Sequence, residues 1–465
     1  MRSHSAMKST GTPHSSENHT PQNNQTASLG TQKTAAAGSG DDGLEKITVL
    51  LNKHPSSANL FAAGEVRCLR KLGYDIALTA LESTLDLGGD LNPEIRAESE
   101  ATHYLRARGR LRELAHHLRA AAKPLSYFTV VYWAIRLDGW LGLLRNRHVA
   151  DVLALDRWMR RHGIRHLHAH FGSEAARVAV LMKHFRPVTV SLTLGNADDL
   201  HYAGMTRLQQ KVEAADFIIC VGIAARTALM RLTPHRYWHK YDACAPGVDT
   251  LRFQPRPPRL KPGTFTVLCV GALEPYNGQR TLLEACKMLR ESGREIRLVL
   301  VGAGSDEAEL KNLAKAADLE HAVTLTGALS QDRLCDWYSR ADAFVNSSLS
   351  ADMSLPAMEA MASGLACVSA RTTGMLELIR EGSDGLLVEP ASAHELAGAL
   401  LRLMDDEDLR KHLAGHGRAR ILQKYSLART SERFGFLFQT RLSSRHGRRR
   451  TAVASDAHRM KSGPS

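Results

Sequence analysis

The chain has 465 residues, of which 43% are hydrophobic, and it carries 61 Lys and Arg against 48 Asp and Glu. This length suggests two or three domains, each large enough to bury a core. A net charge of +13 is compatible with nucleic acid, anionic lipid or phosphorylated molecules as partners. Much of the excess is confined to one internal run and a C-terminal tail, so we do not interpret it as a nucleic-acid-binding face.

Cysteine usage indicates the compartment. The seven cysteines are scattered without a CxxC pair, and several lie in apolar runs. We expect reduced and mostly buried thiols, as in cytosolic proteins, and no disulfide framework. No apolar signal segment or stretch of about 18 or more apolar residues is present, so we expect a cytoplasmic protein.

The N-terminal third begins with a polar segment and continues as an alternating pattern. Residues 1–43 have almost no large apolar side chains, so we expect them to be disordered. Beyond them, Ile47–Leu51 is expected to be a strand, a helix is expected from about Leu60 to Leu72, and Ile76 begins another strand. This order is typical of the βαβ opening of a Rossmann-like domain.

A basic run precedes an aromatic one. Six cations lie between Arg106 and Lys123, and the segment Leu125–Leu144 contains aromatic residues interrupted by Arg136 and Asp138. Aromatic side chains beside basic ones suit a helix that lies in an anionic membrane interface. The alternative is a core helix with solvated charged ends.

Three histidines alternate along the next predicted strand. His166, His168 and His170 would share one face, because strand side chains alternate. A metal cluster would need further ligands, and no acidic or thiol residues lie nearby in the sequence, so we expect none. Further strands are expected at residues 188–192, 217–221, 266–270, 298–301 and 323–326.

The stretch from about 343 to 388 is the most informative. An apolar run at 343–347 predicts a buried strand, and a loop of small residues follows it. Leu355 and Pro356 begin a helix that Gly364 ends. A loop that meets a helix N-terminus after a parallel strand can bind an anion. Glu359, on the first turns of this helix, can accept hydrogen bonds from a ribose diol.

This helix carries a resemblance to a known family. Leu355–Gly364 reads LPAMEAMASG and resembles the nucleotide-sugar site of retaining glycosyltransferases of family 4, in which Leu-Pro-Ala-Leu-Glu-Ala-Met-Ala-x-Gly recurs. Further residues that fit the family pattern are Phe61, Glu65, His168–Phe171, Asp216, Gly247–Asp249, Gly374, Glu377 and Gly385–Val388. The resemblance covers about residues 44 to 440. It implies the α/β fold called GT-B, in which two Rossmann-like domains with parallel sheets face each other across a cleft.

The resemblance also implies a domain order. We expect a disordered tail at 1–43, an N-terminal acceptor-side domain at 44–254, a linker at 255–262, a C-terminal nucleotide-sugar-binding domain at 263–425, a helix at 426–443 that returns to the first domain, and a disordered basic tail at 444–465. The linker is stiff because it is rich in proline.

The site residues follow from the same resemblance. The candidate donor-binding residues are Gly271, Asn277, Arg280, Gly327, Ala328, Leu329, Ser354, Leu355, Pro356 and Glu359. Glu359 would hold the ribose, backbone groups at 327–329 the nucleobase, and Arg280 part of the diphosphate. His170 and Asp352 are the candidate catalytic residues. The resemblance implies no cofactor and no metal, with the nucleoside-diphosphate sugar as donor substrate.

Four positions depart from the family pattern. The family has Arg, Lys, Glu and His where this chain has Ala272, Asn277, Ala351 and Gly195. Two cations would stabilise the departing diphosphate, so the loss of both is expected to slow turnover.

Two functions of different classes follow. The first is a glycosyltransferase that moves a sugar from a nucleoside-diphosphate sugar to a lipid-linked or polysaccharide acceptor in exopolysaccharide or cell-envelope glycan synthesis. It would be cytoplasmic or peripheral at the inner face of an anionic membrane, without a nucleic-acid partner. The second is a catalytically weak or inactive scaffold or regulator of a polysaccharide assembly complex. Other GT-B activities, such as an epimerase or a phosphorylase, are a third and weaker option.

Overall fold

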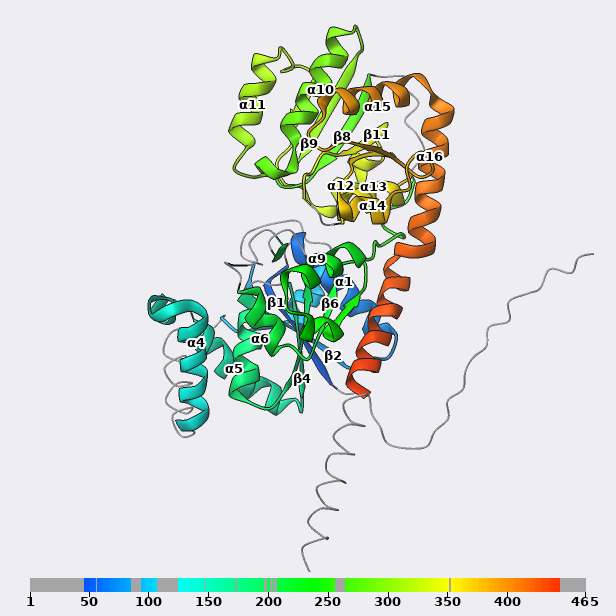
Figure 1. The fold of residues 1–465 in the computed structure, drawn as a ribbon. Coiled ribbons are helices and arrows are strands. Elements are labelled where there is room, and N and C mark those ends of the chain that lie inside the picture. Colours follow the sequence, from blue (N-terminus) through cyan, green and yellow to red (C-terminus); the bar gives the residue numbers. More distant parts are fainter. Residues whose placement is uncertain are drawn as a thin grey trace, which may run out of the picture. The chain divides into compact units, whose positions relative to one another are not determined.

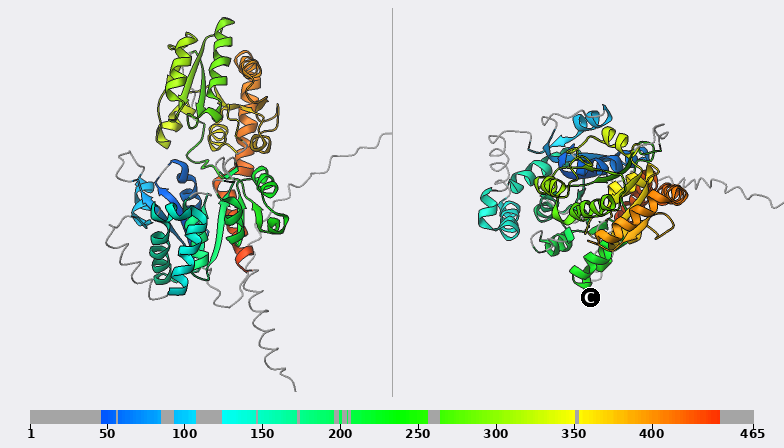
Figure 2. Two further views of the ribbon diagram at one scale, coloured as in Figure 1. Left: turned by 60° about the vertical axis from the view of Figure 1, so that its left-hand side comes forward. Right: turned by 90° about the horizontal axis from the view of Figure 1, so that it is seen from above.

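The computed structural model describes residues 46–55, 57–84, 93–106, 124–145, 147–171, 174–195, 199–200, 204, 207–255, 264–350 and 353–443. All of them belong to the unit Leu44–Ser465. Two parallel sheets organise this unit, and helices cover both faces of each (Figures 1 and 2). The predicted tails and most of the predicted linker lie outside the described residues.

The first sheet has the strand order β3-β2-β1-β4-β5-β6-β7, and its pairs are parallel. Its strands are β1 (Ile47–His54), β2 (Ile76–Ser83), β3 (His103–Tyr104), β4 (His166–His170), β5 (Thr189–Leu194), β6 (Phe217–Cys220) and β7 (Tyr241–Ala243). The helices between them are α1 (Ser57–Lys71), α2 (Pro93–Ala101), α4 (Pro124–Arg145), α5 (His148–Arg161), α6 (Glu174–Phe185), α8 (Leu208–Ala214), α9 (Ile223–Leu232) and the 3₁₀ helix η2 (His235–Lys240).

The second sheet has the order β10-β9-β8-β11-β12-β13 and is also parallel. Its strands are β8 (Phe265–Val270), β9 (Ile296–Val301), β10 (Val323–Leu325), β11 (Ala343–Asn346), β12 (Ala366–Ala370) and β13 (Leu386–Val388). The helices are η3 (Pro275–Asn277), α10 (Gln279–Glu291), α11 (Glu307–Ala316), α12 (Gln331–Tyr338), α13 (Leu355–Ala362), α14 (Thr373–Leu378), α15 (Ala393–Asp405), α16 (Glu407–Arg420) and the π-helical η4 (Ile421–Tyr425).

Alternation along β8 shows why its sequence forms a central strand. Val267 and Cys269 belong to the apolar cluster on one face, and Leu268 belongs to the cluster on the other. Because successive side chains point to opposite faces, a strand covered on both sides needs a continuous apolar run. The sequence-based expectation of a doubly covered parallel sheet is confirmed for both domains.

A helix over residues 427–443 follows η4 and packs on the first sheet (Figure 1). Phe434 and Phe438 join the apolar cluster of β1, β2 and α1. Their rings meet those of His168 and His166 edge-on, each at 5.5 Å between ring centroids. The C-terminal helix therefore completes the core of the first domain.

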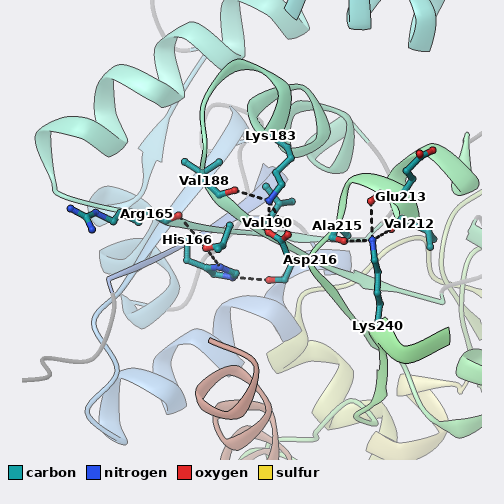
Figure 3. A network of polar contacts seen from close by, with 12 residues as sticks. Arg165, His166, Lys183, Val188, Val190, Val212, Glu213, Ala215, Asp216 and Lys240 are labelled. Atoms are coloured by element: carbon teal, nitrogen blue, oxygen red, sulfur yellow. Dashed lines mark hydrogen bonds and ion pairs between the residues drawn. The ribbon is translucent and has the colours of Figure 1, made fainter. Parts of the chain in front are cut away.

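Two lysines join elements of the first domain to one another by hydrogen bonds, as Figure 3 shows. Lys183 donates to Asp216 at 2.7 Å and to the carbonyl oxygen of Val188 at 3.0 Å, which joins α6 to the beginning of β5 and β6. Lys240 donates to the carbonyl oxygens of residues 212, 213 and 215, at the C-terminal end of α8. A cation at a helix C-terminus satisfies orphan carbonyls and complements the helix dipole.

The structure changes the interpretation of Arg106, the first residue of the basic run that was predicted to face lipid. Arg106 has a side chain only 12% exposed, and it pairs with Glu82, Asp151 and Glu174 at 2.9 Å each. A guanidinium buried among three carboxylates is structural, so the prediction that Arg106 binds lipid is wrong. The remaining arginines of the run lie outside the described residues.

Helix α4 packs on α5 and α6 (Figure 1), breaks at Gly139, where φ is +75°, and carries exposed aromatic side chains on both sides of this break. Val130 and Ala134 are buried, whereas the aromatic residues Phe128, Tyr132 and Trp140 are 68%, 54% and 64% exposed. Trp133 instead stacks on His184 at 3.9 Å between ring centroids. Among the described residues, no helix is both long enough and apolar enough to cross a membrane. All seven cysteines are free, and all except the half-buried Cys68 are buried, as the sequence predicted.

Candidate nucleotide-sugar site

The second sheet changes direction between β8 and β11. The chain adds β9 and β10 on one side of β8 and then returns to add β11, β12 and β13 on the other. In open parallel sheets, ligands bind outside the carboxyl ends of the strands at such a switch point. The predicted donor residues Gly271, Asn277, Ser354 and Glu359 lie in the segments that follow these two strands.

Glycines allow the backbones at this edge to approach closely. Gly302 adopts φ +150°, and a Cβ there would lie 1.8 Å from the carbonyl oxygen of Gly271. Its N–H donates to the carbonyl oxygen of Gly327 at 3.0 Å. The structure therefore brings together the predicted residues Gly271 and Gly327, with Gly302 between them. Ala328 and Leu329 follow Gly327, and Leu329 packs against the apolar cluster beneath α13.

The loops after β8 and β11 are bonded to each other. Gly278, with φ +67°, leaves room for the Ser347 carbonyl oxygen, which a Cβ would approach to 2.2 Å. Ser347 Oγ donates to the backbone oxygen of Asn277 at 2.8 Å, and Ser348 Oγ donates to Asn277 Oδ1 at 2.9 Å. Asn277 Nδ2 donates to the carbonyl oxygen of Ala272 at 2.8 Å. Asn277 thus connects the two loops, at the position where the family has a lysine.

The remaining candidate cation is already paired. Arg280 donates to both carboxylate oxygens of Asp306, at 3.0 Å from Nε and 2.5 Å from Nη2. The arginine holds the pKa of the Asp306 carboxyl below its usual value, chiefly by this hydrogen bonding. The prediction that Arg280 binds the diphosphate stays a prediction, and it requires the guanidinium to exchange this carboxylate for a phosphate.

Helix α13 begins where the sequence predicted. Its N-cap uses one of the backbone N–H groups that could otherwise bind an anion. Ser354 Oγ accepts from the N–H of Ala357 at 3.3 Å, and Pro356 has no N–H. Of the four residues 354–357 at this helix N-terminus, two therefore offer no free backbone donor. The helix dipole remains, but fewer N–H groups can reach a phosphate than the sequence suggested.

Glu359 lies on α13 and is only 6% exposed. Its Oε2 accepts a hydrogen bond from Tyr338 Oη at 2.9 Å. Burial raises the pKa of the Glu359 carboxyl to about 7, although the bond from Tyr338 and the charge of Arg252 favour the ionised form. An acceptor of this kind, at the carboxyl edge of the sheet, is suited to a ribose diol.

The first sheet has a switch point of its own, between β1 and β4. The predicted catalytic residue His170 ends β4, and its Nε2 lies 3.2 Å from Glu65 Oε2, with both side chains buried. His54 ends β1, is fully buried, and has no hydrogen-bond partner among the described residues. Burial lowers the pKa of His54 to about 4, so the ring is neutral at physiological pH.

The other catalytic candidate and one departure cannot be placed. Asp352 and Ala351 lie outside the described residues. Gly195 can be placed, and its surroundings explain the departure: φ is +116°, and a Cβ would lie 2.6 Å from the Cβ of Ala225. A histidine at 195 would therefore require α9 to move. No group of three or more His, Cys, Asp or Glu that could hold a metal ion is present in the described part of the chain.

The sequence missed the side chains that surround the predicted ones. Tyr338 and Asp306 contribute to the switch point of the second sheet through contacts that span 21 or more residues of sequence, and His54 lies buried at the end of β1 beside the switch point of the first. Tyr338 ends α12, and no local pattern in the sequence links it to Glu359.

The arrangement of the two parallel sheets defines the structural class of this chain. It is GT-B, and solved structures of that architecture align over most of the chain. Anabaena HepE in complex with UDP matches with a TM-score of 0.66 and 16% identity, over 85% of this chain and all of HepE. Sucrose-phosphate synthase of Thermosynechococcus elongatus matches with a TM-score of 0.67 and 19% identity, over 86% of this chain and all of the synthase.

The sequence comparisons define the family of the second domain. Residues 252–420 match the family described as glycosyl transferases group 1, so this region is a group 1 glycosyltransferase domain. An Escherichia coli K12 protein described as a colanic acid biosynthesis glycosyltransferase, WcaL, is 24% identical over 76% of this chain and 89% of its own length.

Other relatives are similar mainly in one region. The amylovoran biosynthesis glycosyltransferase AmsK of Erwinia amylovora is 36% identical over 30% of this chain and 36% of AmsK. The D-inositol 3-phosphate glycosyltransferase of Pseudarthrobacter chlorophenolicus is 32% identical over 36% of this chain. The match spans only 43% of that relative's length.

Proposed function

We propose that this chain is a glycosyltransferase that transfers a sugar from a nucleoside-diphosphate sugar to a lipid-linked or polysaccharide acceptor. The observation that carries the proposal is the buried Glu359 carboxylate on α13, beside the switch point of the second sheet. The resemblance implies that transfer retains the anomeric configuration. The relatives named for colanic acid and amylovoran synthesis support an exopolysaccharide or cell-envelope glycan as the product.

The donor proposal has further support from HepE, which was solved with UDP and with UDP-glucose. UDP is therefore the first nucleotide to test, followed by GDP and ADP. The donor is proposed to bind without a cofactor or a metal. The location proposed is cytoplasmic, peripheral at the inner face of an anionic membrane, with the exposed face of α4 as the contact.

A specific observation favours the second candidate, a catalytically weak glycosyltransferase-like scaffold. Asn277 has its amide engaged between two loops, Arg280 is paired with Asp306, and Ala272 carries no charge. With both family cations replaced, the negative charge of the leaving diphosphate has less stabilisation. A single lost donor of this kind typically costs about 10²–10³ in rate.

Calorimetry and a turnover assay distinguish the two functions. Binding of UDP, GDP or ADP together with sugar transfer to a lipid-linked acceptor supports the enzyme. Binding without transfer supports the scaffold. Absence of binding to every nucleotide of the panel would contradict the enzyme.

A further inference from the structure

The hydroxyl of Tyr338 lies between two oxygen atoms of α13. Its Oη is 2.9 Å from Glu359 Oε2 and 3.1 Å from the carbonyl oxygen of Pro356. Tyr338 is 1% exposed and Glu359 is 6% exposed, so bulk water does not compete for these contacts. The contact with Glu359 is buried, and the contact with Pro356, in the first turn of the helix, is partly buried.

A hydrogen count shows why this arrangement has two states. A tyrosine hydroxyl has one hydrogen, and both neighbouring oxygens accept when Glu359 is ionised, so Tyr338 can serve only one of them. When Glu359 is protonated, its own O–H can donate to Tyr338 Oη, and Tyr338 can then donate to Pro356. The direction of the Tyr338 hydroxyl is thus coupled to the charge of Glu359.

We propose that Tyr338 is a positioning residue of the nucleotide site, whose hydroxyl holds Glu359 as a charged acceptor for the ribose diol, so that nucleotide affinity rises with pH across the neutral range. The proposal rests on the proposed function for the identity of the ligand, and it adds the residue and the proton that control the site. A protonated Glu359 has one acceptor oxygen fewer to offer a diol, because one oxygen carries the proton.

Among the groups around Tyr338 and Glu359, we expect Glu359 to be the main one that titrates near neutral pH. Arg252 is the cation that acts on it, and Cys335 and Cys269 are thiols that interact electrostatically with Tyr338. Burial raises the pKa of the Cys269 thiol to about 12, so it remains neutral.

The elements packed against α13 carry polar groups that make contacts of their own. Asn346 of β11 and Ser369 of β12 are neutral and bond to each other at 3.0 Å. Burial raises the pKa of the Cys367 thiol on β12 to about 12. Arg418 of α16 donates to the carbonyl oxygen of Ala362 at the opposite end of α13. Tyr425 of η4 donates to the carbonyl oxygen of Glu377 at 3.0 Å.

The direction of the titration follows from burial. Desolvation raises the pKa of Glu359 from 4.5 to about 7, and the Tyr338 hydrogen bond opposes this rise. Removing that bond would raise the midpoint further. The folded protein binds the Glu359 proton more tightly than the unfolded chain does, so this group's contribution to stability is lost as pH rises from 4.5 towards 7.

The experiment measures UDP and uridine binding calorimetrically between about pH 5.5 and 9 for the wild type, Tyr338→Phe and Glu359→Gln. Uridine keeps the ribose diol but lacks the phosphates, whose own last ionisation occurs near pH 6 by analogy with phosphate esters. Wild-type affinity for both ligands should fall by up to about tenfold per pH unit below the midpoint. In Tyr338→Phe the midpoint should move to higher pH, with affinity recovered there. In Glu359→Gln the uridine profile should be flat.

A second readout does not depend on any ligand. The ¹³Cδ chemical shift of Glu359 should titrate near neutral pH in the wild type and at higher pH in Tyr338→Phe. A purely structural tyrosine would lower affinity equally at all pH values and leave the midpoint unchanged, which would overturn the proposal. If no nucleotide binds but Glu359 titrates as expected, the proposed function fails and the coupling stands. If Tyr338→Phe does not fold, a wild-type Glu359 midpoint below pH 5 overturns the proposal.

Discussion

Ser348 Oγ donates to Asn277 Oδ1 at 2.9 Å, and this bond joins the loops that follow the two central strands of the second sheet. Asn277 also donates to the carbonyl oxygen of Ala272 at 2.8 Å. An asparagine that holds two loops together has a different role from a lysine that binds a phosphate. The asparagine at 277 therefore removes a positive charge from the site and adds hydrogen bonds that hold its loops together.

Restoring the two cations should have different effects on the free energy of unfolding. Ala272 is exposed, so Ala272→Arg should leave the free energy of unfolding unchanged. Asn277→Lys should lower it by about 1–3 kcal/mol, because one partly buried and one exposed hydrogen bond are lost. Denaturant unfolding of each variant measures this difference.

The same variants test the charge at the site. UDP affinity should increase in Ala272→Arg by at most about 1.5–3 kcal/mol, the scale of hydrogen bonds to charged groups. Uridine affinity should not change, and uridine serves as the control because it lacks the diphosphate. Equal gains for UDP and uridine would show that residue 272 does not face the phosphates.

The buried histidines of β4 are expected to share one tautomer. Ser191 Oγ lies 2.8 Å from His166 Nε2 and 2.8 Å from His168 Nδ1. Because the hydroxyl has one hydrogen, it donates to one ring and accepts from the other, so two neutral rings in this arrangement would carry their proton on the same type of nitrogen. Thr189 Oγ1 is 2.8 Å from His166 Nδ1 and donates to the carbonyl oxygen of Arg165, which favours protonation at Nδ1.

Long-range ¹H–¹⁵N NMR measures this tautomer directly. Burial holds the pKa of His168 well below its usual value, so its ring should stay neutral from about pH 6 to 8. Ser191→Ala should uncouple the rings and lower the free energy of unfolding by about 1–3 kcal/mol, since buried ring nitrogens lose a partner. Opposite tautomers in the wild type would contradict the hydrogen-bond assignment.

The exposed aromatic side chains of α4 should bind anionic vesicles. Phe128→Ser together with Trp140→Ser should weaken flotation with such vesicles, because these exposed aromatic side chains can enter the lipid interface. Leu251→Ser is the matched control, since Leu251 is 85% exposed and lies outside α4. Arg106→Gln should lower stability instead, because it leaves Asp151 buried without its cation. Equal binding by the double variant and the control would exclude α4 as the contact.

The fold could be predicted because its signals are local. Apolar runs such as Val267–Val270 and Phe344–Val345 predicted central strands, and Leu355-Pro356 with Gly364 predicted both ends of α13. Asp406 caps α16 by accepting from the N–H of Leu409 at 2.8 Å.

The site could be predicted only in part, because its chemistry depends on pairing across the fold. The sequence indicated Arg280 as a spare cation, but Asp306, 26 residues away, engages it. The sequence also indicated a histidine missing at 195, but not that Ala225 leaves no space for one. Burial of Glu359 beside Tyr338 decides its protonation, and no local pattern contains that information.

The most direct test of the account is UDP, GDP and ADP binding to the wild type and to Glu359→Ala by calorimetry at pH 8, where Glu359 is ionised. Glu407→Ala is the control, because Glu407 lies on the surface of α16 and pairs with Lys411. The account predicts that at least one nucleotide binds the wild type and the control equally. Affinity for that nucleotide should fall by about 1–3 kcal/mol in Glu359→Ala, the scale of hydrogen bonds to a charged group. Unchanged affinity in Glu359→Ala, or no binding by the wild type, would contradict it.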